Sequence, residues 1–269
     1  MVNHWPMTSL ATMRLETAGA LARLTLERPE VLNAGDARFA RDLKAAVATL
    51  AERPEIRVVA LTGAGRAFST GVDLTALAHG ELGMADFIAW EDAMTAMERM
   101  DKLFIAGING HCLGGGLQLA LVCDYRLASD EALLGLPAVK ECLIPSMSLW
   151  RLPRLIGLAR AKELILLGEP VSARTAERYG VVHRVVEAAE FPRAFEATLE
   201  RFLALPPASA RASKVLSTRA FDVDFETFRK EMETLLAGCL ASDEHRRAMA
   251  AIRASKPRAL SLRDDKGAM

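Results

Sequence analysis

Two glycine-containing segments carry the residues best suited to chemistry. The first runs from Arg66 to Leu74, and the second, from Asn109 to Ala120, contains three consecutive glycines at 114–116. Glycines between a buried strand and a helix leave a stretch of backbone without side chains, so a ligand can approach the N–H groups at the helix N-terminus. The natural ligand for such donors is an oxygen that gains negative charge during a reaction.

An oxyanion hole needs a second N–H donor besides the one in the glycine triplet. Thr70, which precedes Gly71 in the first segment, is the candidate, and Gly115 is its expected counterpart. The two segments would then hold one carbonyl between them. The alternative is that both segments are tight turns that let helices pack, since glycine-rich turns are common.

The order of these segments also resembles that of a known family. Arg-Ala-Phe-Ser-x-Gly-x-Asp-Leu and Asn-Gly-x-x-x-Gly-Gly-Gly-x-x-Leu-Ala, about forty residues apart, look like the oxyanion-hole segments of the crotonase, or enoyl-CoA hydratase/isomerase, superfamily. The resemblance begins at Leu26 and extends to Val182, and so covers most of the chain. It specifies a fold more closely than a reaction.

The resemblance implies an α/β fold: a crotonase-like spiral of ββα units at residues 1–204, followed by a helical trimerisation region at 205–269. The implied ligand is an acyl-CoA thioester, in which coenzyme A belongs to the substrate and is not a permanently bound cofactor. The implied assembly is a homo-trimer or a dimer of trimers.

Site residues follow from the same resemblance. Thr70 and Gly115 match the oxyanion donors, and Arg66 matches a basic position near the CoA phosphates, where a guanidinium suits the geometry. A solvated surface arginine is the alternative for Arg66, and for Asp73 hydrogen bonds that hold its loop are the alternative to a direct role in catalysis. The other residues expected to contact the ligand are Phe68, Gly71, Asp73, Leu74 and Gly114.

Two positions depart from the family pattern. Hydratases of the family place one glutamate three residues after the middle glycine and another in a Gly-x-Pro-Glu stretch, but this chain has Gln118 and Ala138 there. An amide can orient water but cannot exchange a proton, and alanine can do neither. The sequence therefore favours enolate stabilisation that leads to isomerisation, decarboxylation, C–C cleavage or a variant hydration. A non-catalytic acyl-CoA-binding protein is the alternative.

The proton-transfer group is then expected elsewhere in the pocket. Glu141, three residues after Ala138, is the nearest carboxylate, and its alternative is a solvated glutamate. His111, Glu91 and Asp92 are further candidates. A loop histidine bonded to backbone explains His111 more simply, and a solvated helix face explains the other two.

Composition argues against several other classes of function. The 34 basic and 34 acidic residues cancel, so no overall field attracts nucleic acid or an anionic membrane. No apolar run approaches the roughly 20 residues that span a bilayer, and we expect a cytoplasmic protein. The cysteines lack metal-binding spacing, so neither disulfides nor a metal site is expected. These cysteines are Cys112, Cys123, Cys142 and Cys239.

Alternating strands and helices are expected to position these segments. The alternation of apolar and polar residues predicts a hairpin over 12–27. Asp36 is predicted to cap a helix that ends near Glu52. Beyond Phe191 helical periodicity continues to about Arg253, and the polar residues 256–269 are expected to fray. Further strands are predicted at 57–62, 103–108, 125–128, 132–134 and 182–186, and further helices at 87–100, 149–155 and 159–167, from Gly116 and from Ala173.

Overall fold

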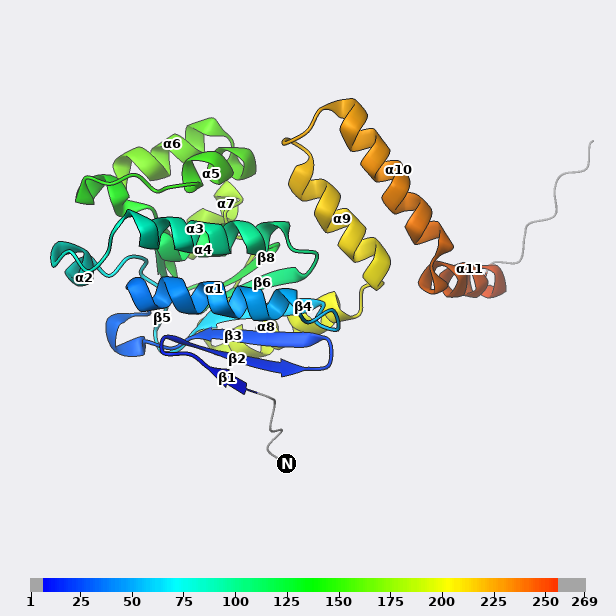
Figure 1. The fold of residues 1–269 in the computed structure, drawn as a ribbon, viewed down its shortest axis with the longest axis horizontal. Helices are drawn as coiled ribbons and strands as arrows, with labels where there is room; N and C mark the ends of the chain where they lie inside the picture. The colour runs from blue at the N-terminus through cyan, green and yellow to red at the C-terminus, as the bar shows by residue number, and fades with distance from the viewer. Residues whose placement is uncertain (1–6, 256–269) are drawn as a thin grey trace, which may run out of the picture. The chain divides into compact units, whose positions relative to one another are not determined.

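The computed structural model describes residues 7–255, in which two β-sheets are surrounded by helices (Figure 1). The larger sheet has the strand order β1-β2-β3-β4-β6-β8-β11, and the smaller has the order β10-β9-β7-β5. The strands of the larger sheet are β1 (Met7–Ser9), β2 (Met13–Ala18), β3 (Leu21–Leu26), β4 (Val58–Gly63), β6 (Leu103–Ile108), β8 (Tyr125–Ser129) and β11 (Arg184–Val186). Those of the smaller sheet are β5 (Ala67–Ser69), β7 (His111–Leu113), β9 (Leu133–Gly135) and β10 (Val171–Ser172).

In the larger sheet β1 pairs antiparallel with the predicted hairpin, β2 and β3, and the strands from β3 to β11 are parallel. Both faces of the parallel strands are covered. Val59 and Leu61 of β4 belong to one buried cluster, whereas Val58 and Ala60 belong to another. Successive side chains of a strand point to opposite faces, which explains why these strands read as unbroken apolar runs.

Helices cover each face of this sheet. On one face α1 (Ala37–Ala51) and α3 (Met84–Arg99) lie side by side, and on the other α8 (Phe191–Leu203) packs against β4, β6 and β8 (Figure 1). The Asp36 side chain accepts the N–H groups of Arg38 and Phe39, so α1 begins where its cap was predicted.

The two glycine-containing segments become neighbours in the smaller sheet. β5 pairs in parallel with β7, with Ala67 opposite His111. A short helix follows each strand: α2 (Leu74–Ala78) after β5 and α4 (Gly115–Leu121) after β7. Neither β5 nor α2 is among the elements predicted from the sequence, because such short elements carry little periodicity.

Three further helices and three 3₁₀ helices complete this part of the chain. The helices are α5 (Ser148–Ile156), α6 (Leu158–Leu167) and α7 (Ala173–Tyr179), and the 3₁₀ helices are η1 (Pro29–Val31), η2 (Pro137–Glu141) and η3 (Ala188–Glu190). The predicted helices at 149–155 and 159–167 are thus confirmed to within a residue at each end.

The chain divides into two compact units after Leu205. The second unit contains α9 (Pro207–Arg219), α10 (Phe225–Ala241) and α11 (Asp243–Ser255). No residue of α10 is buried, and Phe225 is 75% exposed. The stretch 256–269, predicted to fray, lies outside the described residues. Within residues 7–255 no helix is both long and apolar enough to cross a membrane.

Candidate active site

A cavity of about 670 Å³, open to solvent, lies where the two glycine-containing segments meet α3 and η2. Its wall combines apolar side chains with backbone and a few polar groups. The lining residues are Thr70, Val72, Leu74, Phe87, Trp90, Glu91, Met94, Gly114, Gly115, Gln118, Pro137, Ala138, Glu141, Leu143, Ile144 and Ser146.

The glycines bring the two segments into backbone contact at this cavity. A Cβ atom added to Gly71 would lie 2.5 Å from the Gly115 nitrogen, and one added to Gly116 would lie 2.2 Å from the Ser69 carbonyl oxygen. Gly71 also has a φ of +89°, in the left-handed region that side chains rarely adopt. The close packing proposed as an alternative role for these glycines is therefore real, and it leaves backbone amides at the cavity wall.

The backbone amides of the first loop differ in whether they are hydrogen-bonded. The Thr70 N–H donates to the Leu32 carbonyl at 3.1 Å, so the expected donor is already engaged. The Gly35 carbonyl accepts the N–H of Asp73, and Gly35 pairs with Val72 in a parallel bridge. In this pairing the Val72 N–H points away from Gly35. Among residues 7–255 the Val72 N–H has no hydrogen-bond partner. The structure thus argues against Thr70 as a donor and leaves Val72 available.

The second loop leaves the predicted amide free. The Gly114 N–H donates to Gly135 at 2.9 Å, and the Gly114 carbonyl accepts the N–H of Gln118. Gly115 is the first residue of α4, and an amide in the first turn of a helix has no partner within the helix. Gly115 finds none elsewhere in the described chain either. The free amides of Val72 and Gly115, on neighbouring loops, can together bind an oxygen that gains negative charge.

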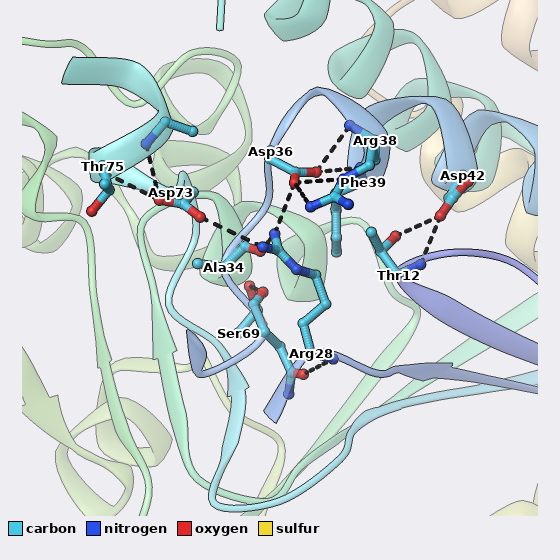
Figure 2. A network of polar contacts seen from close by, with 12 residues as sticks. Thr12, Arg28, Ala34, Asp36, Arg38, Phe39, Asp42, Ser69, Asp73 and Thr75 are labelled. Carbon is cyan, nitrogen blue, oxygen red and sulfur yellow. Dashed lines mark hydrogen bonds and ion pairs between the residues drawn. The ribbon is translucent and has the colours of Figure 1, made fainter. Parts of the chain in front are cut away.

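Asp73 fixes the first loop from outside the cavity (Figure 2). Its Oδ1 accepts the N–H groups of Thr75 and Ala76 at 3.1 Å and so caps α2. Its Oδ2 lies 3.7 Å from Nη2 of Arg28, whose other terminal nitrogen lies 3.4 Å from Asp36. These contacts tie the loop to the start of α1 and support the loop-holding interpretation of Asp73.

Comparison with known proteins agrees with this geometry. Residues 16–256 match the family model described as enoyl-CoA hydratase/isomerase. The chain belongs to this family. Members of the enoyl-CoA hydratase/isomerase family are enzymes that act on CoA thioesters, and the crotonase-like fold with C-terminal helices is confirmed.

Individual members of the enoyl-CoA hydratase/isomerase family are similar over most of their length. The chain is 36% identical to the (E)-benzylidenesuccinyl-CoA hydratase of Thauera aromatica over 79% of this chain and 84% of the relative. It is 30% identical to the short-chain-enoyl-CoA hydratase of Clostridium acetobutylicum over 88% and 92%. A Thermobifida fusca protein crystallised in complex with CoA superposes with a TM-score of 0.76 at 32% identity, over 86% and 93%.

The departures from the enoyl-CoA hydratase/isomerase pattern face the cavity. Gln118 is 9% exposed and lines the wall beside Gly115, and Ala138 lines it from η2. Both positions at which the resemblance led us to expect a glutamate therefore lie at the cavity but carry no carboxylate. Glu141, at the end of η2, also lines it and is half-buried.

The structure separates the expected ligand-contacting residues into two groups. Leu74 and Gly114 line the cavity. Phe68 is wholly buried in the core, which contradicts direct contact with a ligand, and Arg66 is exposed and lies outside the cavity lining. The remaining candidate, His111, is also absent from the lining.

Glu91 is the residue whose surroundings the sequence misjudged. It lines the cavity together with Phe87, Trp90 and Met94, which lie on one face of α3. The Glu91 side chain is 19% exposed and forms a 2.7 Å ion pair with Arg151, so the predicted solvated face is wrong for this residue. The helical spacing of the four residues was a usable signal, but it could not show that their face borders a cavity.

Arg151 carries a persistent positive charge behind this wall. Burial by itself disfavours the charged guanidinium, yet the hydrogen bonds and charges of Glu91 and Glu98 raise the pKa of Arg151 above its ordinary value. Its side chain is only 4% exposed. The arginine therefore places a buried positive charge beside both glutamates.

None of the four cysteines, all of which lie within residues 7–255, lines the cavity. Cys112 and Cys123 are buried, and burial raises the pKa of the Cys112 thiol well above its usual value. Within residues 7–255 no group of three or more His, Cys, Asp and Glu side chains is arranged to hold a metal ion.

Proposed function

We propose that the protein is an enzyme that binds an acyl-CoA ester and stabilises the enolate of its thioester between the amides of Val72 and Gly115. One observation carries the proposal: both N–H groups lack partners in the described chain, although their neighbours Thr70 and Gly114 are bonded. Unpartnered backbone donors are rare, and a pair of them on touching loops at a cavity suits a developing oxyanion.

The proposed reaction is a lyase or isomerase reaction that begins with proton transfer at the α-carbon. Ordinary hydration by two glutamates is not proposed, because Gln118 and Ala138 stand at those positions and such acid–base groups contribute about 10²–10⁴-fold. Gln118 retains a role as an amide that orients a water or a substrate oxygen. Isomerisation uses this first step directly. A variant hydration uses it in reverse, because water adds to the β-carbon to give the enolate and the α-carbon is then protonated. Decarboxylation and C–C cleavage reach the same enolate from other substrates.

Coenzyme A is proposed as part of the substrate. The CoA complex of the Thermobifida fusca relative supports this choice of ligand. Arg66, exposed just before β5, remains the proposed contact for CoA phosphates, because its guanidinium is accessible from solvent. The acyl group is proposed to lie against Trp90, Met94 and Ile144, which form an apolar part of the cavity wall.

A homo-oligomer is also proposed, as a trimer or a dimer of trimers. The support is the surface of α10, which buries none of its residues in the chain itself. Large apolar side chains on it remain open to solvent, including Phe225 at 75%, Leu236 at 51% and Leu240 at 54%. Such a helix is stabilised when its apolar side is covered by another subunit.

The test removes one donor with little change to the backbone. Gly115 occupies the first position of α4, where proline is well tolerated, so Gly115→Pro deletes the N–H and keeps the helix start. Gly115→Ala adds a Cβ atom 3.1 Å from the Trp90 ring but retains the donor, and serves as the matched control. A panel of enoyl-, 3-hydroxyacyl- and malonyl-type CoA esters is assayed with each protein.

We expect Gly115→Pro to lower kcat by about 10²–10³-fold relative to Gly115→Ala on every ester that the wild type converts. Equal rates in the two variants would contradict the proposal.

A second candidate, a non-catalytic acyl-CoA-binding protein, is favoured by the loss of both glutamates at Gln118 and Ala138. Esters that raise the melting temperature of the wild type but are never converted would favour it, since a bound ligand stabilises the folded state.

A further inference from the structure

We infer that Glu91 is the catalytic base of this site and exchanges a proton with the α-carbon of the acyl group. The inference rests on the proposed function and adds the residue that the replaced glutamates leave missing. It is carried by the position of Glu91 at the cavity and by the unequal environments of its two carboxylate oxygens.

One oxygen of Glu91 is fixed. Oε1 lies 2.7 Å from Nη2 of Arg151 and accepts the hydroxyl of Thr95 at 3.2 Å. Thr95 in turn accepts a hydrogen bond from Arg151 at 3.2 Å. A side chain with its rotamer held by two neighbours keeps its second oxygen in one place, which is the arrangement that proton transfer requires.

The other oxygen is unused. Glu91 Oε2 is buried and has no hydrogen-bond partner in the described chain. A buried carboxylate oxygen without a partner costs free energy unless it serves a ligand. Three more buried polar atoms on α3 and α5 also lack hydrogen-bond partners: Trp90 Nε1, Ser148 Oγ and Arg151 Nη1. The unmet hydrogen-bonding capacity is thus concentrated where Arg151 of α5 meets the face of α3 that lines the cavity.

The other acidic groups are less suited to the role. Asp92, the next residue of α3, is exposed and is absent from the cavity lining. Glu141 lines the cavity, but within residues 7–255 no hydrogen bond or ion pair fixes its carboxylate. Glu98 shares Arg151 with Glu91, at 3.0 Å, yet does not line the cavity.

The proposed step balances within the site. The Glu91 carboxylate takes the α-proton, the C–H electron pair moves into the thioester, and the carbonyl oxygen becomes an enolate held by the Val72 and Gly115 amides. The neutral Glu91 carboxyl then returns a proton to the α-carbon or to the γ-carbon of an unsaturated chain. Solvent deuterons that exchange onto Glu91 in between label the substrate.

Deuterium exchange in D₂O tests the step with any acyl-CoA ester that enters the site, whether or not it is the natural substrate. The full-length protein is incubated with butyryl-CoA and with 3-hexenoyl-CoA, and label at the α-carbon is followed by mass spectrometry. Three variants are compared: Glu91→Gln, Glu98→Gln and Glu141→Gln. Glu98→Gln removes the other ion pair of Arg151 and therefore controls for structural effects of weakening this cluster.

We expect Glu91→Gln to slow exchange by about 10²-fold or more while ester binding stays within about threefold, and Glu98→Gln to exchange at nearly the wild-type rate. Exchange in Glu91→Gln that matches Glu98→Gln would overturn the inference, and loss of exchange in Glu141→Gln alone would give the role to that residue. A wild type that binds both esters without labelling either would overturn the proposed function as well, so the two failures are distinguishable.

Discussion

The two sides of the cavity are built in different ways. On the side of the glycine-containing loops, the functional groups are backbone amides, and their positions are fixed by strand pairing, by the cap of Asp73 and by glycines that no side chain can replace. On the side of α3 and η2, the functional groups are side chains on separate helices. In the proposed function the first side binds the thioester carbonyl whatever its acyl group, whereas single substitutions can change the chemistry of the second side.

The largest effect is expected from Gly71→Ala on the backbone side. A Cβ atom there would lie 2.5 Å from the Gly115 nitrogen, and the residue has a φ of +89°. We expect a loss of about 10²-fold or more in kcat together with about 2–4 kcal/mol of stability, since the loops must move apart. Gly80→Ala is the control, because Gly80 has a φ of +72° but nothing within 4 Å of the added atom. Equal losses in activity would mean that contact between the loops is unimportant.

A gain of function is expected on the side-chain side. The double substitution Gln118→Glu and Ala138→Glu restores the carboxylates that the family's hydratases carry, on backbone that already lines the cavity. Hydration of crotonyl-CoA should then rise by about 10²-fold, measured as loss of the enoyl absorbance. Val139→Glu, at a position that is 42% exposed and outside the lining, adds a similar charge as a control. If the double variant hydrates crotonyl-CoA no faster than this control, two carboxylates are not enough for hydration at this wall.

A smaller effect is expected at Asp73 and distinguishes a role in holding the loop from a role in catalysis. Asp73→Ala removes the cap of α2 and should cost about 1–2 kcal/mol in chemical denaturation. Asp73→Asn keeps an oxygen for the cap and loses only the charge near Arg28, 3.7 Å away, so it should cost less than about 1 kcal/mol. If Asp73→Asn abolished turnover with unchanged stability, Asp73 would act in catalysis and the loop-holding interpretation would be wrong.

The smallest effect concerns His183, remote from both sides of the cavity. Its Nδ1 accepts the Arg126 amide at 3.2 Å, and burial together with the Arg126 charge lowers the pKa of His183 to about 4 from 6.5. His183 therefore binds a proton below about pH 6.5 in the unfolded chain but only below about pH 4 in the folded chain. The contribution of His183 to stability should be fully present above about pH 6.5 and should fall as the pH drops toward 4, by at most about 1 kcal/mol because the residue is only partly buried and solvent screens its charge.

Denaturation of His183→Gln across this pH range checks the expectation. The variant should lose part of the acid dependence. An unchanged dependence would assign it to other groups.

Much of the fold was predictable because its signals are local. Asp36 caps α1 as expected, and the apolar run at 103–108 is β6. The helix predicted from Gly116 begins one residue earlier, at Gly115, whose amide has no partner in the described chain. In each case the deciding interaction lies within a few residues of the signal.

The missed parts of the site depend on distant segments. Val72 rather than Thr70 has the free amide because Leu32 and Gly35, more than thirty residues earlier, engage the neighbouring backbone groups. Glu91 was a candidate that a solvated helix face explained more simply, because periodicity gives the faces of a helix but not what lies against each face. Its partner Arg151 follows it by sixty residues, and no local pattern connects the two.

The pairing of β5 with β7 sets the distance between the two loops that bear the Val72 and Gly115 amides. Adjacent strands lie about 4.8 Å apart, so the distance between the two loops that follow them is a property of sheet hydrogen bonding and not of any side chain. A stable mimic of the enolate, with an anionic oxygen on a CoA analogue, should therefore lose little affinity when the walls are altered. The same inhibitor could thus report on carbonyl binding across every wall variant, active or not.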